Sequence, residues 1–190
     1  MQKNIVAAPQ LAGQGKQKIE WVKRNMPILR QIEDDFRKHQ YFSGLRVLVC
    51  IHLEAKTAYL AQVFAAGGAE VAVTGSNPHS TKDDVVAALA EEGMHVYARY
   101  GATPEEMRQY MNRALDVRPN IMIDDGGDIA ELVHTERQEL LPEVLGACEE
   151  TTTGVLRAKA RAKAGVLEFP VVLINDARCK YLFDNYHGTG

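Results

Sequence analysis

The sequence predicts an α/β fold: a doubly wound, mostly parallel sheet with helices on both faces. Short apolar runs rich in valine and isoleucine recur along the chain, and most are continuous rather than alternating, as expected of parallel strands covered on both sides. Longer helical patterns separate the earlier runs, and this alternation is typical of the class. With 190 residues, the chain is long enough for one domain with a sizeable core.

Six strands are expected at the apolar runs, namely 47–51, 69–73, 95–98, 120–123, 143–147 and 170–175. Helices are expected between the earlier strands, over 57–68, 80–93 and 103–115. A Gly stop ends the first two, a Ser or Thr cap starts the second, and Thr, Pro and two glutamates start the third. Before the first strand, apolar residues at helical spacing predict a helix over 16–38 with a kink at Pro27.

Two further features of these helices have structural interpretations. Trp21, the only tryptophan, is expected to be a packing anchor. The basic stretch 157–165 is expected to be the solvated face of a helix that ends at Gly165.

Composition limits the class of protein. The net charge is −3 without a block of like charge, so neither nucleic acid nor an anionic membrane is the expected partner. Three cysteines without metal-ligand spacing predict neither a disulfide scaffold nor a metal site. The sequence has no apolar run long enough for a bilayer and no signal-peptide pattern, so we expect a soluble cytoplasmic protein.

Glycine-rich phosphate-binding turns are not found. No G-x-G-x-x-G follows a strand, and no G-x-x-x-x-G-K-[ST] occurs. The chain is therefore not expected to bind a dinucleotide by the usual glycine turn.

Polar side chains gather where predicted strands end, which is where open α/β sheets bind ligands. There are four such clusters: His52 with Glu54, Lys56 and Thr57; Asp124, Asp125 and Asp128 around Gly126 and Gly127; Asn175 and Asp176, continuing through Lys180, Asp184 and Asn185; and 148–155, where Glu149 or Glu150 lies near a helix start.

Each cluster also has an ordinary structural explanation. A histidine after a strand is often a capped side chain, Asp-Asp-Gly-Gly is a good turn with Asp128 as a helix N-cap, and the threonines at 151–153 can be a cap. Together the clusters can form one crevice with acids, a lysine and a histidine. That set suits acid–base chemistry on a polyhydroxylated ligand, and the residues alone lead no further.

Longer motifs carry a family resemblance. "DDGGD" (124–128), "EETTTGV" (149–155) and "VVLINDARCKYLFDN" (171–185) occur in this order. On these motifs the chain resembles the N-terminal half of the S-adenosylhomocysteine hydrolases. The resemblance implies that 1–190 is a substrate-binding domain ending near the hinge to an NAD-binding domain that this chain does not contain, with Asn175 and Asp176 near the hinge.

The resemblance also implies a reaction. S-adenosylhomocysteine, or its S-inosyl analogue, is reversibly split into nucleoside and homocysteine by NAD-dependent 3′-oxidation, elimination, water addition and reduction. Lys180 matches the lysine that takes the 3′-hydroxyl proton, and His52 and Asp125 match the pair that moves protons at C4′ and C5′.

The same resemblance assigns binding roles. Glu150 and Asp184 match the residues that hold the ribose hydroxyls. The cofactor-binding positions match threonines that touch NAD and an asparagine at the nicotinamide end: Thr151, Thr152, Thr153 and Asn185. A homo-oligomer is implied for the complete enzyme.

The substrate base is expected to contact Glu54, Lys56 and Thr57. In the commoner family pattern, the first two positions carry a threonine and a carboxylate or amide that read adenine. Ionised Glu54 only accepts hydrogen bonds and Lys56 only donates them, which fits hypoxanthine better than adenine. A variant of this type also resembles the archaeal-like branch of the family. Two alternatives stay open: the two side chains pair with each other, or backbone groups read the base.

Two other hypotheses about the function stay open as well. One is a non-catalytic nucleoside- or partner-binding domain left by truncation. The other is an unrelated flavodoxin-like module, which requires the motifs to be coincidence. On either the family reading or the first alternative, the isolated chain is expected to be inactive.

Overall fold

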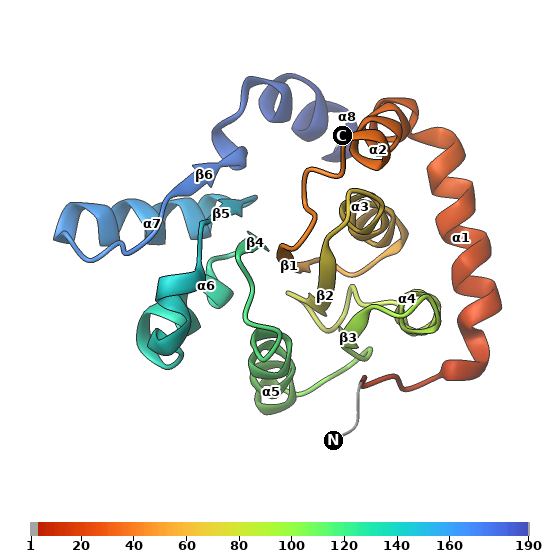
Figure 1. Cartoon of the computed structure of the whole chain (residues 1–190), viewed down its shortest axis with the longest axis horizontal. Helices are drawn as coiled ribbons and strands as arrows, with labels where there is room; N and C mark the ends of the chain where they lie inside the picture. Colours follow the sequence, from red (N-terminus) through yellow and green to blue (C-terminus); the bar gives the residue numbers. More distant parts are fainter. Residues whose placement is uncertain (1–3, 190) are drawn as a thin grey trace.

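The structure is a computed structural model that describes residues 4–189. One parallel sheet forms its centre, with strand order β3-β2-β1-β4-β5-β6 (Figure 1). The strands are β1 (Arg46–Ile51), β2 (Glu70–Gly75), β3 (His95–Tyr97), β4 (Ile121–Asp124), β5 (Gly146–Glu149) and β6 (Val171–Leu173). The predicted α/β class is confirmed.

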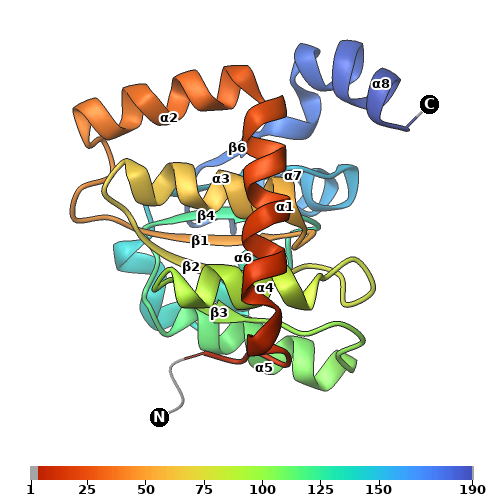
Figure 2. The ribbon, with the colours of Figure 1, turned by 90° about the vertical axis from the view of Figure 1, so that its right-hand side faces the viewer.

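Helices cover both faces of the sheet (Figures 1 and 2). The α-helices are α1 (Ala12–Asn25), α2 (Pro27–His39), α3 (Ala55–Ala66), α4 (Asp83–Glu91), α5 (Pro104–Leu115), α6 (Asp128–Thr135), α7 (Thr152–Ala164) and α8 (Asn185–Thr189). Shorter helical turns are η1 (Pro9–Leu11), η2 (Gln138–Glu143), η3 (Ile174–Asp176) and the π-helical η4 (Lys180–Asp184).

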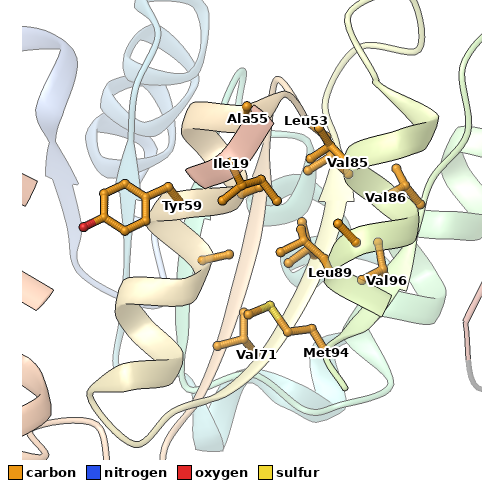
Figure 3. Packing of buried hydrophobic residues seen from close by; sticks show 14 of the residues in the cluster. Ile19, Leu53, Ala55, Tyr59, Val71, Val85, Val86, Leu89, Met94 and Val96 are labelled. Carbon is orange, nitrogen blue, oxygen red and sulfur yellow. The ribbon is translucent and has the colours of Figure 1, made fainter. Parts of the chain in front are cut away.

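Two hydrophobic cores lie on opposite faces of the sheet. The first contains Ile19 of α1, Tyr59 of α3 and Leu89 of α4 (Figure 3). The second contains residues of α5 and α6 packed on β4, with Leu115 and Met122 fully buried. Covered on both faces, the strands need the continuous apolar runs seen in the sequence.

Most predicted elements are confirmed, but two of them differ in their bounds. The fifth strand is 146–149 rather than 143–147, because the chain around Pro142 forms η2 and the strand continues into Cys148 and Glu149. The long N-terminal helix is two helices. Met26, with φ −120° and ψ 70°, leaves the helical region because the residue before a proline is excluded from it.

The other differences concern side chains. The hydroxyls of Ser80 and Thr81 do not cap α4, which begins after Lys82; both donate to the carbonyl oxygen of Asn77 instead. Trp21 is 66% exposed and so is not a packing anchor among the described residues.

The N-terminal helix α1 crosses the outside of α4 at close range. A methyl group added at Gly15 would overlap the backbone carbonyl of Asp84, whereas at Gly13 it would meet nothing within 4 Å. We expect Gly15→Ala to lower the free energy of unfolding by about 1–3 kcal/mol, as overpacking does. Gly13→Ala, in the same helix, should raise it by about 0.5–1 kcal/mol, because alanine loses less backbone entropy. Urea unfolding measures both, and equal effects would contradict the close packing.

Within residues 4–189, no helix combines the length and the apolar character needed to cross a membrane.

Candidate active site

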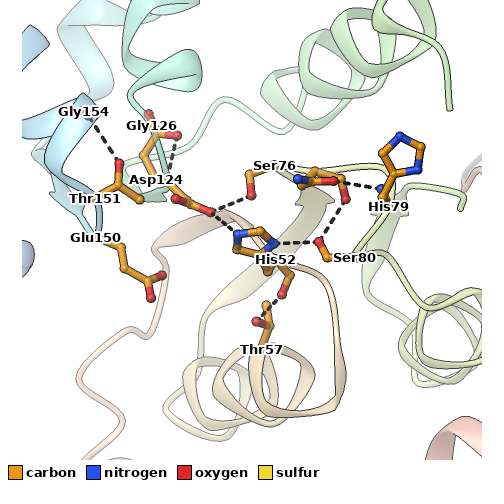
Figure 4. A network of polar contacts seen from close by, with 12 residues as sticks. His52, Thr57, Ser76, His79, Ser80, Asp124, Gly126, Glu150, Thr151 and Gly154 are labelled. Atoms are coloured by element: carbon orange, nitrogen blue, oxygen red, sulfur yellow. Dashed lines mark hydrogen bonds and ion pairs between the residues drawn. The ribbon is translucent and has the colours of Figure 1, made fainter. Parts of the chain in front are cut away.

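The ligand crevice of such a sheet lies where the strand order reverses, which here is between β1 and β4. Cys50 of β1 pairs with Asp124, and Asp124 pairs with Glu149, so three strands end level with one another. His52 and Glu150, just beyond two of these ends, come to the same edge of the sheet (Figure 4), and Asp125, beyond the third, lies beside His52.

His52 and Asp125 face each other across the reversal point. The Nε2 atom of His52 is 3.4 Å from Oδ2 of Asp125, and the hydroxyl of Ser76 donates to the same oxygen at 2.7 Å. The Nδ1 atom of His52 is 2.6 Å from the hydroxyl oxygen of Ser80, and Thr57 donates to the His52 carbonyl at 2.5 Å. The predicted pair is thus brought together, with two serines of the loop after β2 as partners.

Lys180 and Glu150 approach from the next strands. The Lys180 ammonium donates to the backbone carbonyl of Glu150 and, at 2.9 Å, to Oδ1 of Asn175. Burial raises the pKa of Glu150 first, and the charges of Asp125 and Asp184 raise it further, while Lys180 and His52 oppose the shift. These mutual effects put the predicted acids, lysine and histidine in one electrostatic cluster.

Two buried carboxylates lie beneath the cluster and hold the loops that carry Asp125 and Glu150. Asp124 is 1% exposed; its Oδ1 accepts from the backbone N–H of Asp125, and its Oδ2 accepts from Ala130 in the first turn of α6. The predicted role of Asp124 in building this turn is confirmed. The N-cap of α6 is Gly127, with φ 79°, rather than Asp128, which forms an ion pair with Arg157.

Glu149 does the same for the neighbouring loop. Its Oε1 accepts from the N–H of Gly126 and from the N–H and hydroxyl of Thr151, each at 2.9 Å. A side chain at Gly154 would overlap this carboxylate, so α7 approaches it only because residue 154 is a glycine. Thr151 is the N-cap of α7, as one interpretation of the threonines predicted.

The buried Asp124 makes stability depend on pH. Burial raises its pKa from 3.8 to about 7, hydrogen bonds from Ala130 lower it, and the charge of Glu149 raises it. Between these two values the folded chain holds a proton that the unfolded chain has lost. The contribution of Asp124 to stability therefore falls as pH rises from about 4 to about 7, by up to about 4 kcal/mol, and is constant above.

We expect Asp124→Asn, which cannot ionise, to lack this dependence. The wild-type free energy of unfolding should fall relative to that of the variant as the pH rises from about 5 to about 7, and the difference should then level off. Urea unfolding across this range measures it. A difference that does not change with pH would contradict the assignment.

Glu54 and Lys56 lie at the start of α3. Glu54 is the N-cap, and its Oε1 accepts from the backbone N–H of Lys56 at 3.2 Å. The Lys56 ammonium is 3.9 Å from the same oxygen, and its side chain is 68% exposed. The expected pairing of the two side chains is therefore present only as a long contact, and it engages Oε1 rather than Oε2.

The residues assigned to NAD lie at the margin of the cluster. Thr152, Thr153 and Asn185 are exposed, while the Thr151 hydroxyl is bonded to Glu149. In a dinucleotide-binding sheet, the pyrophosphate sits at the N-terminus of the helix after β1. Here the carboxylate of Glu54 occupies that position, so this sheet cannot hold the pyrophosphate there. The exposed groups fit a contact to one end of a dinucleotide held elsewhere.

The structure adds residues that sequence reasoning missed. Ser76 and Ser80 contact the predicted pair, while Glu149, which the sequence placed in the fourth cluster, shapes the loop of Glu150. The signal for the serines was available, because the polar stretch 76–81 also follows a strand and was interpreted only as a helix start. Among residues 4–189, no three histidine, cysteine or acidic side chains form a group that could hold a metal ion.

Comparisons with known proteins agree on one family. The sequence model of the family described as S-adenosyl-L-homocysteine hydrolase matches 3–143 and 135–187. An adenosylhomocysteinase from Pyrococcus abyssi is 56% identical over 95% of this chain, and one from Thermococcus kodakarensis is 54% identical over 95%. An S-inosyl-L-homocysteine hydrolase from Methanocaldococcus jannaschii is 52% identical over 93%. The chain spans 43% of the length of each.

The fold and the polar cluster define an α/β protein that carries acids, a histidine and a lysine at the edge of the sheet where the strand order reverses. The chain belongs to the S-adenosyl-L-homocysteine hydrolase family. The resemblance on the three motifs is confirmed, and an unrelated flavodoxin-like module is ruled out.

Proposed function

We propose that the chain forms the substrate-binding part of an NAD-dependent hydrolase. That enzyme splits S-inosylhomocysteine or S-adenosylhomocysteine into nucleoside and homocysteine. The observation that carries the proposal is the convergence of His52, Asp125, Glu150 and Lys180 at one edge of the sheet. Because the chain spans 43% of its relatives, the activity is proposed for the complete protein, with 1–190 as its substrate-binding domain.

The ribose lies between the carboxylates and the lysine. Glu150 and Asp184 accept hydrogen bonds from the ribose hydroxyls, and the neutral amine of Lys180 takes the proton of the 3′-hydroxyl. Lys180 is held for this by Asn175 and by the Glu150 carbonyl. Bound NAD, touched by Thr151, Thr152, Thr153 and Asn185, would supply the hydride acceptor at C3′, and the oxidised C3′ would acidify the C4′ hydrogen.

His52 and Asp125 act at the other end of the sugar. One of the two removes the proton from C4′, the C5′–S bond breaks, and the pair passes a proton to the departing sulfur. Water then adds at C5′, giving one proton back to the pair, and C4′ regains its hydrogen. Two proton carriers 3.4 Å apart suit this reaction, because together they take up two protons and release two protons in each cycle.

The base contacts Glu54, Lys56 and Thr57. Hypoxanthine presents N1–H as a donor and O6 as an acceptor, the reverse of the adenine edge. A carboxylate and an ammonium at the mouth of the crevice match that polarity, because Glu54 accepts and Lys56 donates. We therefore propose S-inosylhomocysteine as the preferred substrate, in line with the Methanocaldococcus relative, an S-inosyl-L-homocysteine hydrolase.

Release of homocysteine thiol tests the function. The complete protein with NAD should release thiol from a nucleoside thioether at about 1 per second or faster, a rate typical of enzymes. The 190-residue chain alone should release none, since Glu54 caps the helix that a pyrophosphate would need. A complete protein that binds a nucleoside thioether but releases no thiol would instead indicate a non-catalytic binding domain.

A further inference from the structure

The hydroxyl of Ser80 connects His52 to a backbone carbonyl. Its Oγ is 2.6 Å from Nδ1 of His52 and 3.1 Å from the carbonyl oxygen of Asn77 (Figure 4). Neither the motifs nor the roles proposed above involve Ser80.

The single proton of the Ser80 hydroxyl links the directions of the two bonds. A carbonyl oxygen only accepts, and a serine hydroxyl has a single proton to donate. When that proton lies toward Asn77, Oγ of Ser80 can only accept from His52. The nitrogen that donates to it, Nδ1, then carries a proton.

The other ring nitrogen is the open one. Nε2 is 3.4 Å from Asp125, beyond the 2.7–3.2 Å of ordinary N–H···O bonds, and the His52 side chain is 55% exposed. Which nitrogen of a histidine is protonated is set by the bond that the other one makes. Nε2 therefore faces both Asp125 and the crevice without a short bond of its own.

We propose that Ser80, backed by the Asn77 carbonyl, holds a proton on Nδ1 of His52, so that the proton exchanged with substrate is always the one on Nε2. The exchange rests on the function proposed above. Nε2 accepts one proton and returns it within the cycle, while the Nδ1–H···Ser80 bond persists, so no proton is consumed.

The loop after β2 is built to keep Ser80 in place. Asn77 accepts at its side chain from the N–H of His79 at 2.8 Å, and its carbonyl also accepts from the hydroxyl of Thr81 at 3.0 Å. Thr81 thus donates to the same carbonyl as Ser80, while His52 hydrogen-bonds to Ser80. Thr81 therefore provides a matched control for Ser80.

The tautomer is measured by two-bond ¹H–¹⁵N correlation spectra of the histidine ring in the complete protein. Loss of a signal in His52→Gln assigns His52 among the six histidines. In neutral His52 we expect Nδ1 protonated and Nε2 bare. Ser80→Ala should shift the population toward the Nε2–H form, and Thr81→Val should leave it unchanged.

Wild-type His52 with its proton on Nε2 would overturn the proposal, and this result needs no variant to fold. Equal spectra for wild type and Ser80→Ala would overturn it as well. In thiol release, Ser80→Ala should lower kcat by about 10- to 100-fold with little change in KM, since the ring is misprotonated rather than absent. An unchanged kcat would overturn the catalytic use of the tautomer. The spectra remain decisive even if the protein hydrolyses neither thioether.

Discussion

Replacing Lys180 by alanine in the complete protein is expected to stop 3′-oxidation while leaving substrate binding comparatively intact. The Lys180 side chain is anchored by Asn175 and by the carbonyl of Glu150, beside the proposed ribose site. Loss of a positioned base typically costs about 10²–10⁴ in rate. Substrate-dependent absorbance of the bound dinucleotide reports the step directly, and calorimetry reports binding.

Lys159→Ala is the matched control for Lys180→Ala. Lys159 is an exposed lysine of α7 that pairs with Asp176 at 2.9 Å, near the proposed hinge. An exposed pair is worth at most about 1 kcal/mol, so we expect rates within about fivefold of wild type. Wild-type oxidation kinetics in Lys180→Ala would show that the role belongs to another group.

Asp125→Asn is expected to have the second large effect. The Asp125 carboxylate accepts from Ser76 and faces Nε2 of His52. The amide of asparagine carries no negative charge and cannot take up a proton from the substrate. We expect kcat for thiol release to fall by about 10²–10⁴, again the range for a lost proton carrier.

The control for Asp125→Asn lies three residues away. Asp128 is in the same turn, but its carboxylate pairs with Arg157 on the outside of α7. Asp128→Asn should therefore leave kcat within about fivefold of wild type, as expected for a surface ion pair. Similar losses in the two variants would mean that the turn, rather than the Asp125 carboxylate, was disturbed.

The class of fold could be predicted because its signals are local. Runs such as 47–51 are too apolar for any exposed strand, and Thr103, the predicted start of its helix, caps α5 with its side chain. The boundary at 146–149 could not be predicted, because a strand ending in Glu149 depends on that carboxylate being bonded by the N–H groups of two loops.

The sequence predicted which residues would lie together at the site, but not the residues that hold them in place. Strand ends placed His52 and Asp125 together, because parallel strands end at one edge of the sheet. The positions of Ser80 and Glu149 depend on contacts across 28 and 23 residues of sequence, which no local pattern encodes. Asp124 was expected in the turn, but its burial and its raised pKa depend on the packing of the folded sheet and could not be predicted from the sequence.

The central claim is that this crevice binds a nucleoside thioether for hydrolysis and reads hypoxanthine through Glu54 and Lys56. The most direct test compares kcat/KM for S-inosylhomocysteine and S-adenosylhomocysteine in the complete protein with NAD. A mispaired edge costs about 1–3 kcal/mol for each unsatisfied group, so the inosine compound should be preferred by about tenfold or more. A clear preference for the adenosine compound would contradict the assigned base contacts, and no thiol release from either would contradict the claim as a whole.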